Sequence, residues 1–375
     1  MIRRLWSIIK KEFRQIRRDK RVLSILTLVP AFLLFLNGYA LNFDVTHIRL
    51  AVVDLEKSVR SREFLNAFVT SGYFDVVDVL PSAEEATTLL DDAEIRAALV
   101  IPGDFSANLL SGRTVDVQVL VDGVDANAAT TVIGYVQAVT LQYSRGILLS
   151  ALSKIGRQNY IPINYEARIW YNPELKSVKF LVPGLIGFIL TITCVIATAL
   201  SIVREKERNT IEQIVVSPVH AMEFIIGKLV PYAVIALIAA AIVIFAAYLL
   251  FGVEVKGSFL NLFAATLLFV IAALGIGLFI STISESQQVA FQVASLASML
   301  PTLILSGFIF PIRSMPLFLQ IFSNITPAKY YLVILRGIIL KGVGLAAYWE
   351  QMVYLALFSL VVLGISILRF RKTIG

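Results

Sequence analysis

Residue types that commonly catalyse reactions are few in this chain and far apart. The 375 residues include two histidines, His47 and His220, and a single cysteine, Cys194. A catalytic base needs its reaction partner within hydrogen-bond reach, and long apolar segments separate the two histidines. Cys194 can form no disulfide within the chain and falls in one of those apolar segments. We therefore predict no catalytic set here and expect the chain itself not to be an enzyme.

Two further patterns could bind a metal ion or a nucleotide, and neither is complete. Asp54, Asp122 and Asp125 follow short β-branched runs, where aspartate forms turns more often than it binds a cation. Gly227 and Lys228 are adjacent, but a phosphate-binding loop also requires an earlier glycine and a hydroxyl residue after the lysine. The sequence thus predicts no metal, no cofactor and no ATP-binding site in this chain.

A short charged segment, residues 204–218, lies between two long apolar runs and is the most informative stretch of the chain. Thr210 and Gln213 are spaced as a capping box and Pro218 ends the segment, so a short rigid helix is expected. The flanking apolar runs place this helix at a membrane surface, where it can contact a protein outside the membrane. The residues expected to make that contact are Arg204, Glu205, Glu207, Arg208, Thr210, Glu212, Gln213 and Pro218.

Composition places the chain in the class of α-helical polytopic membrane proteins. Hydrophobic residues make up 58% of it and charged residues 16%, and the mean hydropathy is +0.80, which is unlike a soluble protein. A helix needs about 20 apolar residues to cross a hydrocarbon core of roughly 30 Å. Six segments satisfy this requirement: 22–42, 178–203, 224–250, 259–282, 287–311 and 350–369.

Basic residues predict the orientation of these spans. Residues 1–21 carry many more lysines and arginines than acids, which favours a cytoplasmic N-terminus. With six crossings, the charged loop 204–223 and the tail 370–375 fall on the same side, and residues 43–177 lie outside the cytoplasmic membrane. A cleaved signal peptide is the competing interpretation, but the basic region is too long and a poor cleavage site follows it.

The basic N-terminal segment also has a helical pattern. Apolar residues recur at helical spacing over residues 2–16 with basic residues between them, which predicts an amphipathic helix on the inner leaflet. Such a helix either anchors the chain or helps to hold a cytoplasmic partner. Its candidate contact residues are Lys11, Glu12, Phe13, Arg14 and Arg17.

The external segment 43–177 reads as an inserted α/β domain. Four short β-branched runs alternate with helical patterns, which favours a small, partly parallel sheet. A long helix over about residues 126–156 follows and either lifts the domain off the membrane or pairs with a copy of itself. The four strands are expected at residues 48–54, 74–79, 97–101 and 115–122, and the shorter helices near 58–69, 82–90 and 105–110.

Small and polar residues form a stripe on two spans, whereas no charged residue lies near the centre of any span. Ion-coupled transporters usually keep charged groups there, so this absence disfavours that class. The stripe on the second span is typical of close helix packing. The stripe on the fifth span contains glutamines and suits a translocation path or a dimer seam. Its residues are Gln288, Gln292, Ser295, Ser298, Thr302 and Ser306.

Residues 312–349 are apolar but interrupted, so neither half can cross the membrane. They predict short helices that dip back at the outer surface, either as an outer gate or as a simple interfacial hairpin. The gate residues would be Phe308, Phe310, Pro311 and Pro316.

Together these segments resemble the membrane subunit of ABC-2 type exporters, over the whole length of the chain. Residues 11–19 are similar to the family's amphipathic N-terminal helix, and residues 204–213 to its charged coupling segment, with Asn209 where the family usually has glycine. Ser217 with Pro218, and Pro311 with the motif at 326–330, also fit. The subgroup with a large periplasmic domain after the first span, which contains multidrug exporters, looks closest.

The resemblance implies a six-span permease fold and a transport function. The chain would pair with two copies of a separate ATPase, which would supply the ATP and Mg²⁺ sites, and with a second permease chain, like or unlike. A periplasmic adaptor is a further possible partner, and nucleic acid is not expected. The cargo would be an amphipathic or lipophilic compound, such as a drug or a lipid, moved outward. Two alternatives are a membrane-anchored receptor or scaffold with a ligand-binding external domain, and an ion-coupled transporter.

Overall fold

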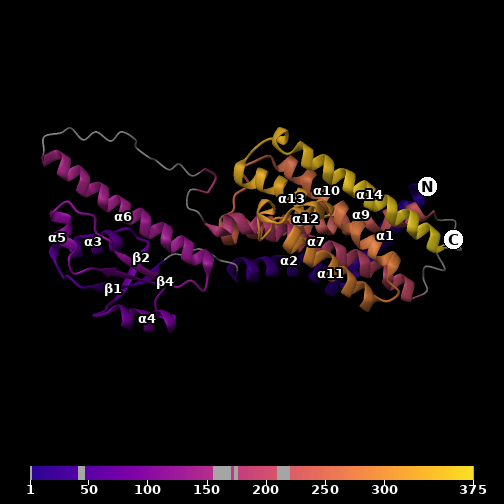
Figure 1. Cartoon of the computed structure of the whole chain (residues 1–375). Helices are drawn as coiled ribbons and strands as arrows, with labels where there is room; N and C mark the ends of the chain where they lie inside the picture. The colour runs from indigo at the N-terminus through magenta and orange to yellow at the C-terminus, as the bar shows by residue number, and fades with distance from the viewer. Residues whose placement is uncertain (1, 41–46, 155–169, 173–175, 209–219, 375) are drawn as a thin grey trace. The chain divides into compact units, whose positions relative to one another are not determined.

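The computed structural model describes residues 2–40, 47–154, 170–172, 176–208 and 220–374, drawn as ribbons in Figure 1. The chain divides into two compact units. The larger unit contains residues 1–42 and 169–375, and the smaller contains residues 43–168. Each unit has its own hydrophobic core and is described separately.

The smaller unit is built on a four-stranded sheet in the order β2-β1-β3-β4. Strand β1 is parallel to both of its neighbours, and β4 is antiparallel to β3. Three strands have the bounds predicted from the sequence, and the fourth begins later than expected, at Gln118. The elements are β1 (Ile48–Asp54), α3 (Val59–Thr70), β2 (Phe74–Val79), α4 (Ala83–Asp91), β3 (Ala97–Ile101), α5 (Phe105–Leu110), β4 (Gln118–Val121) and α6 (Ala126–Lys154).

Both faces of this sheet are covered, which explains why β1 and β3 are continuous apolar runs. On one face, Leu50 and Val52 pack with Phe64 of α3 and Val132 of α6. On the other face, the core includes Ala86 of α4. The smaller unit is therefore a three-layer arrangement of helices around a mixed sheet.

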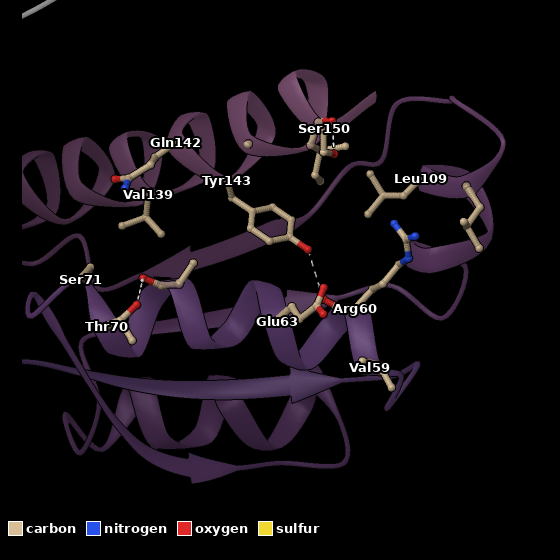
Figure 2. A pocket seen from close by; sticks show the side chains of 14 residues that line it. Val59, Arg60, Glu63, Thr70, Ser71, Leu109, Val139, Gln142, Tyr143 and Ser150 are labelled. Carbon is tan, nitrogen blue, oxygen red and sulfur yellow. Dashed lines mark hydrogen bonds between the residues drawn. The ribbon is translucent and has the colours of Figure 1, made fainter. Parts of the chain in front are cut away.

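A hollow of about 930 Å³ lies between α3, α5 and the second half of α6. Figure 2 shows Tyr143 reaching across it toward α3, where its hydroxyl donates to the carbonyl oxygen of Arg60 at 3.4 Å. Burial and the nearby carboxylate of Glu63 raise the pKa of Tyr143. Tyr143 thus fixes α6 to α3 at one point and leaves open space beside it.

The larger unit is a bundle of long helices. By length and composition, five helices in the described part of the chain can cross a membrane, and a shorter apolar helix spans Leu26–Ala40. The long elements are α1 (Ile2–Arg18), α2 (Lys20–Ala40), α7 (Ser177–Glu207), α9 (Ala221–Phe251), α10 (Phe259–Ile283), α11 (Gln287–Leu305) and α14 (Trp349–Ile374).

Helix α7 is the central element of this bundle and packs against α2, α9, α10 and α11. A side chain at Gly277 of α10 would place its Cβ 2.5 Å from the carbonyl oxygen of Val195, so only glycine permits this crossing. The predicted stripe on the second span, including Gly184 and Thr191, is buried in the bundle. Its small residues therefore serve close helix packing within one chain.

Several helix ends differ from the sequence prediction. Helix α7 continues to Glu207, four residues past the predicted end at 203, because the charged side chains that follow find partners on neighbouring helices. Helix α11 ends at Leu305, before the predicted 311, since Gly307 adopts a positive φ of 80°. Helix α14 extends to Ile374.

Between α11 and α14 the chain forms only short helices. Helix α13 is buried between α7, α10 and α14, and its Tyr331 stacks on Phe269 with ring centroids 4.0 Å apart. The Tyr331 hydroxyl is 3.0 Å from that of Thr266. These elements are a turn at Ile312–Ser314, α12 (Leu317–Phe322), a turn at Ser323–Ile325, α13 (Pro327–Arg336), a π-helical turn at Gly337–Lys341 and a turn at Leu345–Ala347.

Candidate functional site

The N-terminal helix α1 lies against the beginning of α9. Its apolar face includes Ile9 and Ile16, both buried. Gly227 of α9 is what lets the helices approach, since a Cβ there would lie 2.6 Å from the Cγ2 of Ile8. The amphipathic pattern therefore positions α1 on its own bundle, with Arg14 and Arg17 on the exposed side.

Glu12 occupies the buried face of α1 and is only 1% exposed. The cost of burying a carboxylate is offset only if cations and hydrogen bonds accompany it. Lys11 Nζ lies 3.3 Å from Glu12 Oε1, and Lys228 Nζ of α9 lies 3.8 Å from the same oxygen. Glu12 thus connects α1 to α9 through charge as well as packing.

Glu205, near the end of α7, completes this group. Its Oε1 atom lies 3.1 Å from the ammonium groups of both Lys11 and Lys228. Lys228 also donates to the backbone carbonyl of Ser201 at 3.1 Å. We call Lys11, Glu12, Glu205 and Lys228 the charge cluster; it joins α1, α7 and α9 with two positive and two negative groups.

Three members of the charge cluster are buried, and Lys11 is the exposed one. Partial burial by itself would lower the pKa of Lys11, but the carboxylates of Glu205 and Glu12 outweigh it and raise that pKa above its usual value. Lys11 therefore stays protonated at neutral pH. Removing one partner from a buried ion pair costs roughly 3–5 kcal/mol, because the other charge is left without compensation.

The last turn of α7 also contacts the end of α10 and the start of α11. Lys206 Nζ donates to the carbonyl oxygen of Ser281 at 2.5 Å, at the end of α10, where free carbonyls favour a cation. Glu207 accepts the backbone N–H of Gln287 at 2.6 Å, at the start of α11, and also its side-chain amide. An acid at a helix start and a base at a helix end both match the helix dipole.

The structure brings together part of the predicted coupling segment. Arg204, Glu205 and Glu207 belong to the end of α7, and Arg204 lies 3.8 Å from Asp19 at the junction of α1 and α2. Arg208 follows the helix and is exposed. The other four predicted residues lie outside the described residues: Thr210, Glu212, Gln213 and Pro218.

Sequence reasoning gave no role to Lys228, although it is the centre of the charge cluster. The available signal was a lysine about two turns into an apolar helix, together with a glutamate on the apolar side of α1. Gln287, the partner of Glu207, gave no such signal. One of its two contacts is made by its backbone N–H, which does not depend on the residue type.

The polar stripe on α11 separates into two parts. Ser298, Thr302 and Ser306 are buried, and the hydroxyls of Ser298 and Ser306 donate to the carbonyl oxygens of Ala294 and Thr302, one turn earlier. Helix α11 packs against α7. Gln288 and Gln292 are exposed on the single chain, with Ser295 between the two environments. The C-terminal part of the stripe thus packs within the chain, and the two glutamines near its N-terminal end remain available for a translocation path or a second subunit.

The four predicted gate residues also differ in their exposure. Phe308 is buried against Gly184 and Phe188, whereas Phe310, Pro311 and Pro316 are exposed. Arg336 of α13 holds this turn by donating to the carbonyl oxygens of Gly307 and Phe308 at 2.9 and 3.3 Å. Their assignment to an outer gate stays a prediction.

Comparison with known proteins gives a consistent set of relatives. The profile of a family described as "ABC-2 family transporter protein" matches residues 20–368. "Probable multidrug ABC transporter permease YbhS" of Escherichia coli strain K12 is 33% identical over 342 residues, covering 91% of this chain and 89% of that protein. "Probable multidrug ABC transporter permease YbhR" of the same strain is 30% identical over 352 residues, covering 94% of each. "Inner membrane transport permease YhhJ", also from that strain, is 26% identical over 378 residues, covering 100% of this chain and 98% of that protein.

Proposed function

Because the chain belongs to the ABC-2 transporter family, we propose that it is the permease subunit of an exporter that moves an amphipathic or lipophilic compound out across the cytoplasmic membrane. A separate ATPase subunit would hydrolyse ATP, bind its Mg²⁺ and drive the movement. The relatives named as multidrug permeases support this class of cargo.

The charge cluster is the observation that carries the proposal. It joins α1, α7 and α9 at the point where the chain enters residues 209–219, the remainder of the predicted coupling segment. Lys206 and Glu207 add links to α10 and α11. A push delivered to this segment by an ATPase would therefore move the ends of five helices together.

Such a linkage suits a rigid-body mechanism. Closure of two ATPase subunits on ATP would shift the coupling segment, and the buried ion pairs would resist separation of α1 from α7 and α9. The bundle would then rock between inward-facing and outward-facing states instead of bending at one helix end. The energy of ATP hydrolysis would enter the bundle at the charge cluster, so transport would require no charged group near the middle of a span.

Orientation and assembly follow from the same proposal. The charge cluster and both termini would face the cytoplasm, with six crossings that include α2, and the smaller unit would lie outside. Two permease chains, identical or different, would pair with two ATPase copies. Exposed Gln288 and Gln292 would line the path or the seam between the chains, and a periplasmic adaptor would dock outside.

A mild-detergent pull-down of the tagged chain tests the proposal. We expect an ATPase to co-purify, and we expect Glu207→Lys to reduce its recovery or uncouple its ATP hydrolysis from transport. Glu350→Lys, the same charge change at the start of α14, is the control. Membrane insertion should be normal for both variants. Recovery of the wild-type chain without any ATPase, or equal behaviour of the two variants, would contradict the coupling role.

A further inference from the structure

A groove of about 670 Å³ opens between α9 and α10 on the larger unit. Its volume is in the range that holds one drug-sized molecule. It involves neither α11 nor the charge cluster, so it is separate from the path and the coupling site proposed above. The residues that line it are Leu237, Ala240, Ala241, Ile244, Phe245, Tyr248, Val253, Glu254, Val255, Phe259, Leu262, Phe263 and Thr266.

The walls of the groove are apolar and rich in aromatic side chains. Four exposed aromatic residues line it: Phe245, Tyr248, Phe259 and Phe263. From Leu237 to Tyr248 the groove follows α9 for about 16 Å, at 1.5 Å of rise per residue. An elongated aromatic molecule can therefore lie along the helix with one side against the groove wall.

One charged residue lines the groove, and it is acidic. Glu254 lies in the connection between α9 and α10, at one end of the groove, and its side chain is exposed. Among the described residues no hydrogen-bond donor or cation contacts its carboxylate. The groove thus offers a single negative charge at the end of an apolar, aromatic slot.

We propose that this groove binds one lipophilic cation with an aromatic body. Its apolar part would lie between α9 and α10 and its positive charge beside Glu254. Charge complementarity with the unpaired carboxylate selects a cation, and aromatic rings at the wall attract cations and flat ring systems. The site is open at the surface of the bundle, so a ligand reaches it without passing through the chain.

This inference goes beyond the exporter proposal and does not depend on it, because binding needs neither nucleotide nor an ATPase. It adds a second location at which an amphipathic cation contacts the permease. A failure of ATP-driven transport would leave it standing, and a failure of binding would leave the exporter proposal standing.

Equilibrium binding of rhodamine 6G to the full chain in phosphatidylcholine nanodiscs tests the site. Fluorescence polarisation gives Kd after subtraction of the signal from empty nanodiscs. Glu254→Gln should raise Kd about fivefold, the effect expected for one partly solvated ion pair. Ala241→Trp fills the groove and should raise Kd at least about tenfold. Glu350→Gln removes an exposed carboxylate elsewhere and should leave Kd unchanged.

The gel-filtration profile of each variant shows whether its fold is intact. For folded variants, an unchanged Kd in Glu254→Gln, or an equal change in Glu350→Gln, overturns the proposal. Native mass spectrometry tests the alternative that a membrane lipid occupies the groove. If a phosphatidylethanolamine that co-purifies with the wild type is lost in Ala241→Trp and is not displaced by rhodamine 6G, the groove holds a membrane lipid and the proposal is wrong.

Discussion

Replacing Lys228 with methionine probes the charge cluster most severely. Lys228 is 2% exposed, its ammonium lies 3.1 Å from Glu205 and 3.8 Å from Glu12, and it donates to the carbonyl of Ser201. Methionine has a similar length and no charge, so Lys228→Met removes these interactions with little change in packed volume.

The expected loss of stability follows from the charges that remain in the charge cluster after the substitution. Two carboxylates would share the exposed ammonium of Lys11, and removing one partner of a buried pair costs roughly 3–5 kcal/mol. For a unit of this size each kcal/mol lowers Tm by about 2–4 °C. The Tm of Lys228→Met should therefore fall by on the order of 10 °C.

Thermal unfolding of the full chain in detergent, followed by tryptophan fluorescence, measures this loss. Lys256→Met is the control, because Lys256 is exposed and outside the charge cluster. Adding Glu12→Gln to Lys228→Met removes the excess negative charge and should restore about 1–3 kcal/mol, a typical coupling energy for residues in one network. The reasoning is refuted if Lys228→Met is no less stable than Lys256→Met, or if the added Glu12→Gln lowers Tm further.

Three further predictions concern packing, the α11 glutamines and pH. Gly277→Ala should lower stability by about 1–3 kcal/mol, since the new Cβ meets the backbone of Val195, which has no flexible atom to move; an unchanged Tm would contradict this. Gln292→Leu should change the range of transported compounds or the stability of the dimer, with Met299→Leu as an apolar control on the same exposed helix, and normal export with normal assembly would return Gln292 to a simple surface role. Folding raises the pKa of Lys11 above its ordinary value of 10.5, so the contribution of Lys11 to folding stability is complete below pH 10.5 and is lost only as the pH rises through the folded pKa. The difference in Tm between wild type and Lys11→Met should therefore be equal at about pH 6 and about pH 9. A difference that already shrinks between these two pH values would contradict the assigned pairing.

The strands and long helices were predictable because their signals are local. The β-branched runs of β1, β2 and β3 gave the observed bounds, and the apolar runs gave the positions of the long helices. The helix ends were less accurate, since the end of α7 depends on Lys206 and Glu207 finding partners on α10 and α11. Such partners are more than seventy residues away in the sequence, and no local pattern encodes them.

The site was predictable only in part for the same reason. The sequence indicated the charged segment and α1 separately, but it did not indicate that Glu12 and Glu205 share one lysine from a third helix. The sequence predicted one continuous polar face on α11, whereas its division into buried hydroxyls and exposed glutamines depends on where α7 lies. Composition was enough to predict the class of protein, whereas the ionic connection between α1, α7 and α9 is visible only in the tertiary contacts.

The central claim, that this permease is driven by ATP through the charged end of α7, is tested most directly by reconstitution. The chain and its co-purified ATPase would be placed in proteoliposomes, and ATP hydrolysis would be measured together with movement of a fluorescent lipophilic compound. The proposal predicts movement only with hydrolysable ATP, and in Glu207→Lys it predicts hydrolysis with little movement. Movement that follows an imposed proton gradient without nucleotide would contradict it.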